Sequence, residues 1–254
     1  FIGATYPFGM IQFTPSFFSP NKGFVVTQLN GAGCSNMGNF PIIPLNGEII
    51  KSPNDMNSFE KFSRINSSQA GYLSVTMNNN INVDLTATNR SGVAKFEFNN
   101  SKTSTLIIGS GITSSSPEKI KDAYVKITSS NSCEGYTRGG DFCGTETDYK
   151  IFFAAEFDRQ SKKSGTWKEN KFSENSSSRG KNSGAFFTFN TEEKKEINYR
   201  IAISYVSIEN ARENLEKENK YESFNQYKQE TMSVWDKTLS KIKIESNDQK
   251  TSYY

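Results

Sequence analysis

The chain has no histidine in its 254 residues. Without imidazole it cannot build a Ser-His-Asp or Cys-His triad, a histidine-ligated zinc site or the usual general base for neutral pH. Any chemistry carried out by these residues must use carboxylates, lysine, tyrosine or cysteine.

Cysteine is also scarce, because Cys34, Cys133 and Cys143 are the three in the sequence. Three are too few for a disulfide scaffold, and they are too scattered for a four-cysteine zinc site. Cys133 and Cys143 could pair across a hairpin or remain two separate thiols.

Long apolar runs and an excess of one charge are missing as well. No run approaches the roughly 20 apolar residues that a membrane-spanning helix needs, so we expect no membrane span. The 30 basic residues nearly balance the 27 acidic ones, and this predicts no nucleic-acid partner. Aromatic residues reach 13%. Disordered chains are poor in aromatics, so we expect this chain to fold.

The two ends predict a piece of a longer protein. Residues 1–5 (FIGAT) contain no initiator Met, charged segment or apolar segment, so we expect a signal peptide to be absent or already removed. Residues 251–254 (TSYY) follow a strand-like run without a polar tail.

Most of the chain has the alternating apolar and polar pattern of half-buried antiparallel strands. In residues 81–85 we expect the odd positions Ile81, Val83 and Leu85 to face a core, and the even positions Asn82 and Asp84 to face outwards. Short turns of Asn, Gly and Ser separate the segments, without intervening helices, and this predicts a large antiparallel β-sandwich of the mainly β class. The expected strands cover residues 48–51, 71–77, 81–88, 93–98, 104–108, 123–129, 149–158, 184–190 and 198–206.

The period changes after residue 206. Ser207 is a candidate N-cap for a helix whose buried side is Ile208, Ala211 and Leu215. A second helix is expected over 221–240, with its buried side formed by Phe224, Tyr227, Met232, Trp235 and Leu239. We therefore predict a sandwich domain over 1–206, two linker helices over 207–240 and the start of a following segment, beginning with a strand, over 241–254. Residues 161–183 are rich in Ser, Lys and Asn, which predicts an exposed hairpin loop around Gly165–Trp167.

Two groups of residues could carry chemistry. Residues 28–41 (QLNGAGCSNMGNFP) combine three glycines with three asparagines, so the backbone can approach a ligand closely and the amides can match hydroxyl groups. A tight surface loop explains the same residues. The carboxylate pairs Glu146/Asp148 and Glu156/Asp158 each share a strand face, as acid and base residues can. Such pairs are usually solvated rim residues, so we assign catalysis to neither.

Seven collinear segments resemble the N-terminal domain of glycoside hydrolase family 92, the calcium-dependent exo-α-mannosidases of bacteria. Residues 1–12 are similar to its opening F-x-G-A-T-x-P-F-G-M-x-Q, and residues 28–34 to its H-L-S/N-G-x-G-C loop. Gln28 stands where the family usually has His, and Asn39 where it usually has Asp. The seven segments are residues 1–12 (FIGATYPFGMIQ), 28–34 (QLNGAGC), 38–41 (GNFP), 62–76 (FSRINSSQAGYLSVT), 84–92 (DLTATNRSG), 153–158 (FAAEFD) and 203–211 (ISYVSIENA).

The resemblance implies a β-sandwich, two linker helices and then an (α/α)6 catalytic barrel that lies beyond residue 254. The catalytic Glu, the catalytic Asp and the calcium ion belong to that barrel in the family, so no catalytic or metal residue is assigned here. The sandwich contributes loops to the cleft, and the resemblance makes Gln28, Asn30, Gly31, Gly33 and Cys34 the candidate substrate-binding residues.

We therefore expect the non-catalytic part of an inverting α-mannosidase, with a mannose-containing glycan and the C-terminal catalytic domain as partners. This chain alone is predicted to be inactive. Glycan substrates and the missing Met favour a secreted, cell-surface or periplasmic location. The alternatives are a stand-alone carbohydrate-binding or adhesion module, and a scaffold that only supports the barrel.

Overall fold

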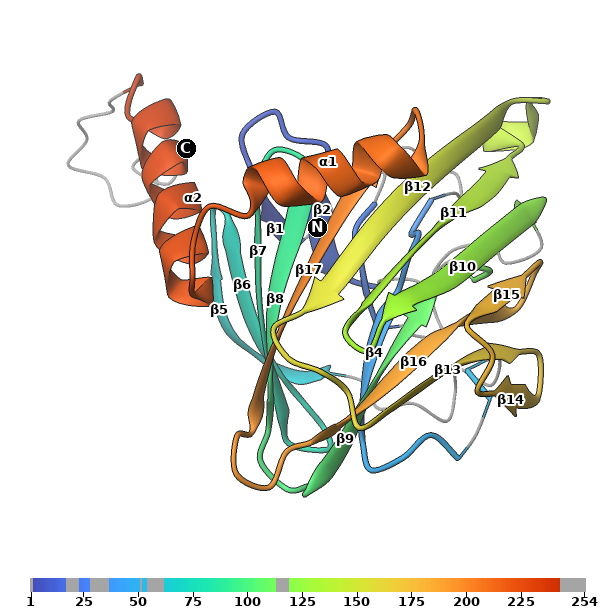
Figure 1. Ribbon diagram of the computed structural model, residues 1–254. Coiled ribbons are helices and arrows are strands. Elements are labelled where there is room, and N and C mark those ends of the chain that lie inside the picture. The colour runs from blue at the N-terminus through green and yellow to red at the C-terminus, as the bar shows by residue number, and fades with distance from the viewer. Residues whose placement is uncertain are drawn as a thin grey trace.

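The computed structural model describes residues 2–16, 23–27, 37–50, 52–53, 62–112 and 119–242. These residues form two facing antiparallel sheets followed by two helices (Figure 1). The predicted fold class, a mainly β sandwich with two helices after it, is confirmed.

Among the described residues the two sheets have eight and nine strands. The strand order of the first sheet is β1 (Ala4–Thr5), β2 (Gln12–Pro15), β3 (Phe24–Val25), β4 (Ile42–Asn46), β9 (Thr103–Gly109), β16 (Ser183–Asn190), β13 (Lys163–Lys168) and β14 (Lys171–Ser173). The strand order of the second is β15 (Ser177–Arg179), β10 (Asp122–Ser129), β11 (Ser132–Gly140), β12 (Asp148–Phe157), β17 (Glu196–Ser204), β8 (Ser91–Phe98), β7 (Ile81–Ala87), β6 (Tyr72–Met77) and β5 (Phe62–Gln69).

Strand β7 illustrates how alternation builds the core. Ile81, Val83 and Leu85 are fully buried, as predicted. Asn82 and Asp84 point to the outer face, where they hydrogen-bond side chains of the neighbouring strands at 2.9 and 2.8 Å. Every second residue is therefore committed to the interior, and the strand register is fixed.

Aromatic side chains join the two sheets across the core. Phe157 of β12 packs against Phe187 and Phe189 of β16, with ring centroids 5.0 and 5.1 Å apart. One cluster of buried residues extends through both inner faces. Burial of large rings is the main stabilising term of such a sandwich.

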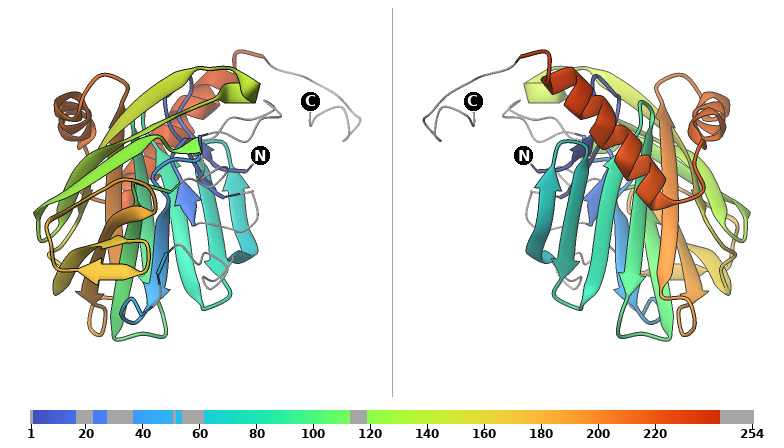
Figure 2. Two further views of the ribbon diagram at one scale, coloured as in Figure 1. Left: turned by 90° about the vertical axis from the view of Figure 1, so that its right-hand side faces the viewer. Right: turned by 90° about the vertical axis from the view of Figure 1, so that its left-hand side faces the viewer.

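The helices are α1 (Ile208–Glu218) and α2 (Phe224–Leu239), and both lie on the outer face of the second sheet (Figure 2). Ser207 caps α1 as predicted, because its hydroxyl accepts from the Asn210 N–H at 3.1 Å. Ser223 and Gln226 form a capping box at the start of α2. Neither helix in the described part of the chain is long and apolar enough to cross a membrane.

Helix α1 lies against small residues. Ala154 of β12 and Ala202 of β17 are paired neighbours that alternate out of the core, yet both are buried. Helix α1 contacts these two strands and brings the fully buried Ala211 against the sheet. Alanine on both sides permits this close approach.

Some predictions about burial along the helices are wrong. Leu215 is half-buried and the Leu239 side chain is 57% exposed, whereas Glu218 and Thr231 are buried. The hydroxyl of Thr231 donates to the Ala87 carbonyl at 2.7 Å. Specific polar contacts with the sheet, rather than an apolar stripe, decide which side faces inwards.

The exposed hairpin loop expected around Gly165–Trp167 is misplaced. A hairpin does form, between β13 and β14, and residues 168–172 are exposed, but its turn lies at residues 169–170. Residues 163–168 form β13, and the Trp167 side chain is 1% exposed in a small cluster with Ile107 and Phe186. The segment is mostly polar because most of its side chains are exposed. Its average composition therefore does not reveal that one large residue, Trp167, is buried and anchors the strand.

Three further predictions concern local features. The strand expected over 48–51 does not form at residues 48–50, because the preceding strand ends before Gly47, which has a φ of +85°. Cys133 is a buried free thiol, so it does not form the disulfide considered with Cys143. Burial raises the pKa of the Cys133 thiol. The strand pattern at 241–245 lies almost entirely outside the described residues.

Candidate functional site

The predicted site residues Gln28, Asn30, Gly31, Gly33 and Cys34 lie outside the described residues. The structure describes the two segments that lead into and out of this stretch, residues 23–27 and 37–40. We call the segment 28–36 the glycine-rich loop and its two flanking segments the loop stem.

A threonine hydroxyl joins the two sides of the loop stem. Thr27 Oγ1 donates to Asn39 Oδ1 at 2.8 Å and accepts from the Asn39 backbone N–H at 2.9 Å. The Gly38 N–H donates to the Thr27 carbonyl at 2.7 Å. Both residues joined by the hydroxyl are buried, so these hydrogen bonds fix the two segments of the loop stem relative to each other.

The returning side of the stem contains left-handed backbone. Met37 and Phe40 have φ values of 68° and 52°, and Gly38 lies between them at 71°. Glycine adopts this conformation freely, whereas it costs a side-chain-bearing residue roughly 1–2 kcal/mol. Strain of this kind persists where surrounding contacts hold it and is frequent at functional sites.

Tyr149 of β12 connects the loop stem to the second sheet. The Asn39 side-chain amide donates to the Tyr149 hydroxyl at 3.3 Å, and the Tyr149 ring packs edge-on against Phe142 at 5.8 Å. Burial raises the pKa of Tyr149, while hydrogen bonds from Asn39 and the Met37 backbone lower it. Tyr149 therefore acts as a neutral anchor for the stem.

Sequence reasoning singled out Asn39 but neither Thr27 nor Tyr149. Asn39 and Tyr149 are 110 residues apart, and nothing in the local pattern of either residue indicates the contact. The Asn39 side chain is an amide whose oxygen and nitrogen are both hydrogen-bonded. The stem is therefore held together without a buried charge.

The two carboxylate pairs do not form an acid–base site. Lys121 and Arg138 both hydrogen-bond Asp148 and lower the pKa of its carboxyl, so it is a poor proton donor at neutral pH. Glu156 pairs with Arg200 at 2.6 Å, and Lys194 donates to Asp158 at 3.2 Å. Three of the four acids are thus engaged by cations.

Within the described part of the chain no group of three or more Cys, Asp or Glu side chains is arranged to hold a metal ion. The calcium expected from the family resemblance therefore finds no ligand set among the described residues.

Comparison with family models places this sandwich among the glycoside hydrolases. The model of the glycosyl hydrolase family 92 N-terminal domain matches residues 1–204, and the model of the family 92 catalytic domain matches residues 210–254. The first match covers most of the chain, so the chain belongs to glycosyl hydrolase family 92. A search of curated proteins by sequence finds no match.

Solved structures give the same fold. The family GH92 α-mannosidase BT3965 from Bacteroides thetaiotaomicron is similar with a TM-score of 0.84 at 23% identity, over 97% of this chain and 37% of that chain. The inverting mannosidase BT2199 from Bacteroides thetaiotaomicron VPI-5482 has a TM-score of 0.79 at 20% identity, over 97% and 35% of the two chains. The family 92 hydrolase ccman5 has a TM-score of 0.84 at 20% identity, over 96% and 35%. This chain thus spans little more than a third of each.

Proposed function

We propose that this chain is the N-terminal portion of a family 92 exo-α-mannosidase that removes mannose from glycans with inversion. The matches over residues 1–204 and 210–254 support the proposal, because the N-terminal-domain model and the catalytic-domain model match one chain in this order. Similar structures include mannosidases, one of them in complex with mannoimidazole.

The role we assign to the sandwich is to hold the glycine-rich loop at the substrate cleft. Thr27, Asn39 and Tyr149 fix the loop stem, and the backbone of Gly31 and Gly33 can approach a sugar closely. Asn30 offers an amide donor and acceptor to its hydroxyls. These contacts orient the sugar and do not transfer protons.

The catalytic acids are assigned to the region that follows this chain. Inversion needs one carboxylic acid to protonate the leaving oxygen and one carboxylate to activate water, about 6.5–9.5 Å apart. The cation-paired acids of the sandwich do not suit the first role, so we infer that the isolated chain is inactive. We assign calcium to the same catalytic region, where a hard cation suits a ligand with vicinal hydroxyls. Its glycan substrates favour a secreted, cell-surface or periplasmic location.

The test is hydrolysis of an aryl α-mannoside by the 254-residue chain and by the same chain extended through the catalytic region. We expect turnover by the extended protein, loss of turnover on chelation and its return with calcium. The short chain should give none, and turnover by it would refute the division of roles.

A substitution in the loop separates a cleft role from a supporting role. Gly33→Trp in the extended protein should lower kcat/KM strongly, while Gly144→Trp, at an exposed glycine with open space around it, should not. Equal activity of the two variants would indicate that the sandwich only supports the catalytic region and does not contribute to the cleft. Millimolar or weaker affinity of the short chain for mannose oligosaccharides is expected, and tight binding would favour a carbohydrate-binding module.

A further inference from the structure

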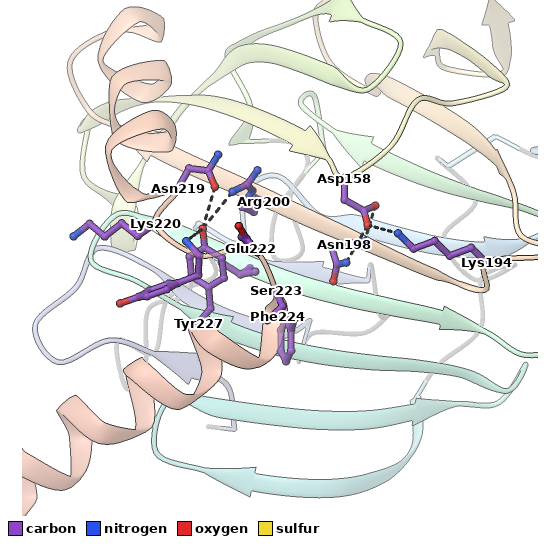
Figure 3. Close-up of a pocket in the computed structure, with 12 residues that line it drawn as sticks. Asp158, Lys194, Asn198, Arg200, Asn219, Lys220, Glu222, Ser223, Phe224 and Tyr227 are labelled. Carbon is purple, nitrogen blue, oxygen red and sulfur yellow. Dashed lines mark hydrogen bonds and ion pairs between the residues drawn. The ribbon is translucent and has the colours of Figure 1, made fainter.

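A cavity of about 400 Å³ lies between the outer face of the second sheet and the connection between α1 and α2 (Figure 3). Residues of β17, the turn before it and β8 form one side, and residues 219–224 with Tyr227 form the other. Small-molecule sites have volumes of roughly 300–1,000 Å³, so the cavity has room for a ligand of one or two sugar rings.

The sheet side of the cavity has a preorganised amide. Asp158 accepts from the Asn198 N–H at 3.1 Å, from Asn198 Nδ2 at 3.0 Å and from Lys194 Nζ at 3.2 Å. A carboxylate accepts and does not donate, so this contact identifies the nitrogen end of the Asn198 amide. The other end, Oδ1, is buried without a hydrogen-bond partner among the described residues.

The helix side is equally fixed. Arg200 pairs with Glu156 at 2.6 Å and donates to the Tyr227 hydroxyl at 3.2 Å. The same hydroxyl lies 3.3 Å from the Glu218 carbonyl and 3.2 Å from Asn219 Oδ1. These contacts hold the guanidinium and the phenol in place before any ligand arrives, which lowers the entropic cost of binding. Figure 3 shows the contacts of the Tyr227 hydroxyl with Arg200 and Asn219.

The charges of the cavity are balanced. Asp158 is paired with Lys194, and Arg200 is paired with Glu156. At the start of α2, the capping box of Ser223 already satisfies the backbone N–H group that could otherwise bind an anion. At the rim, Lys220 and Glu222 are exposed and carry opposite charges. No strong field of one sign remains, so the site favours a neutral ligand over an anion.

An apolar surface completes the site. Val93 and Phe224 are buried in its wall, and Tyr221 is a half-buried ring packed edge-on against Tyr227 at 5.0 Å. A sugar has one face of C–H groups and a rim of hydroxyls. The cavity lining combines aromatic and aliphatic side chains with fixed amide and guanidinium groups, and this combination is complementary to a sugar.

We propose that this cavity binds a neutral pyranose unit of a glycan. The proposal depends on the lining residues and does not require that the proposed mannosidase function be correct. The sugar packs its C–H face on Tyr221 and exchanges hydrogen bonds with the fixed polar groups of β17 and of the α1–α2 connection. No bond is broken there.

The test is titration of the isotopically labelled 254-residue chain, followed by NMR, with four probes: methyl α-mannoside, methyl α-glucoside, glucuronate and sulfate. The neutral glycosides should shift the resonances of Asn198 and Tyr221 with millimolar affinity, while glucuronate and sulfate should bind at least tenfold more weakly. Tighter binding of the two anions than of the glycosides would overturn the proposal, as would the absence of any shift at these residues with the glycosides.

Matched substitutions test the contacts. Tyr221→Ala should weaken glycoside binding about tenfold, and Tyr205→Ala, a half-exposed tyrosine that does not line the cavity, should leave it within twofold. Glu222→Gln, at the rim of the cavity, should also weaken glycoside binding, because an amide is a weaker acceptor than a carboxylate, whereas Glu216→Gln, which does not line the cavity, should not. Both positions are exposed, so this pair provides a test if Tyr221→Ala does not fold. Equal affinity within both pairs would refute the site. Gly33→Trp in the glycine-rich loop should leave this titration unchanged, which separates the cavity from the proposed cleft.

Discussion

The Thr27 hydroxyl has two buried partners on one residue, the backbone N–H and the side-chain oxygen of Asn39. A hydroxyl can donate and accept at once, so a single group satisfies both. The side-chain amide nitrogen of Asn39 donates a hydrogen bond to the Tyr149 hydroxyl. Three neutral side chains thereby connect the two segments of the loop stem with the second sheet.

Thr27→Val should destabilise the chain by about 1–3 kcal/mol. Valine matches the shape of threonine but leaves a donor and an acceptor of Asn39 buried without partners. Urea unfolding of the variant and the parent chain measures the difference. In the extended protein, kcat/KM should also fall, because the two segments of the loop stem are no longer held together.

Thr27→Ser is the matched control for this position. Serine keeps the hydroxyl and loses one methyl group, which costs about 0.8 kcal/mol. If the valine variant proved as stable as the serine variant, the hydroxyl would have no part in holding the loop stem.

At the scale of elements, helix α2 is held to the sheet by close contacts with backbone. Trp235 Nε1 donates to the Thr5 carbonyl at 2.6 Å, and Thr231 donates to the Ala87 carbonyl. Gly71, in the turn between β5 and β6, has no side chain where these two residues approach and has a φ of +82°. The turn and the helix therefore fit only if position 71 is glycine.

Gly71→Ala should shift or loosen α2. An added Cβ would lie 2.6 Å from Thr231 Cγ2 and 2.8 Å from Trp235 Cδ1, well inside van der Waals contact. The left-handed backbone costs roughly 1–2 kcal/mol and the overlap roughly 1–3 kcal/mol more. Urea unfolding and a red shift of the Trp235 fluorescence measure the effect.

Gly144→Ala separates the cost of the left-handed backbone from the cost of the overlap with α2. Gly144 has the same φ of +82° but nothing within 4 Å of an added Cβ, so it should pay the backbone cost alone. Adding Thr231→Ser to Gly71→Ala removes the nearest methyl group and should recover part of the loss. Equal destabilisation by the two glycine substitutions would mean that packing against α2 contributes nothing.

Sequence patterns located many of these elements. Alternation identified β6, β7 and β8, while β9, β10, β12, β16 and β17 were predicted as further candidate strands, and the Ser207 cap identified the start of α1. The same reasoning missed β13, because the buried Trp167 sits in a segment of Ser, Lys and Asn. It also missed Glu218, a buried carboxylate whose partners, the Thr88 hydroxyl and the Arg90 N–H, come from the turn between β7 and β8.

At the scale of the whole molecule, the main core belongs to the sandwich alone. Its buried cluster joins both sheets and extends in sequence to Ile203, whereas the helices contribute to a separate small cluster through Phe224 and Tyr227. Tyr72 and Val93 supply the sheet side of that small cluster. The helices therefore stabilise the outer face of a sandwich whose interior is already complete.

A chain truncated after residue 206 should still fold cooperatively. It keeps every member of the main cluster but exposes Tyr72 and Val93, so we expect a lower urea midpoint and more binding of a hydrophobic dye. Near-ultraviolet circular dichroism reports whether core rings such as Phe153 remain packed. A molten-globule signature would show that the core requires the helices.

The truncation also tests the predicted boundary at residue 206. As a reference for loss of core packing, Phe153→Ala should cost about 3–5 kcal/mol in both the full and the truncated chain. If that substitution had no effect in the truncated chain, the sandwich would not be natively packed there.

The sequence by itself determined the mainly β class, the facing of most strands and the family resemblance, because these follow from periodicity and short motifs that are local in the chain. Tertiary structure decided which polar residues are buried, where Trp167 goes and how the loop stem is held. Those outcomes depend on partners such as Asn39 and Tyr149, 110 residues apart, and chain separation of that size leaves no local pattern. The cavity beside α2 belongs to the same category, since its walls come from two strands and a helix connection that meet only when the helices pack on the sheet.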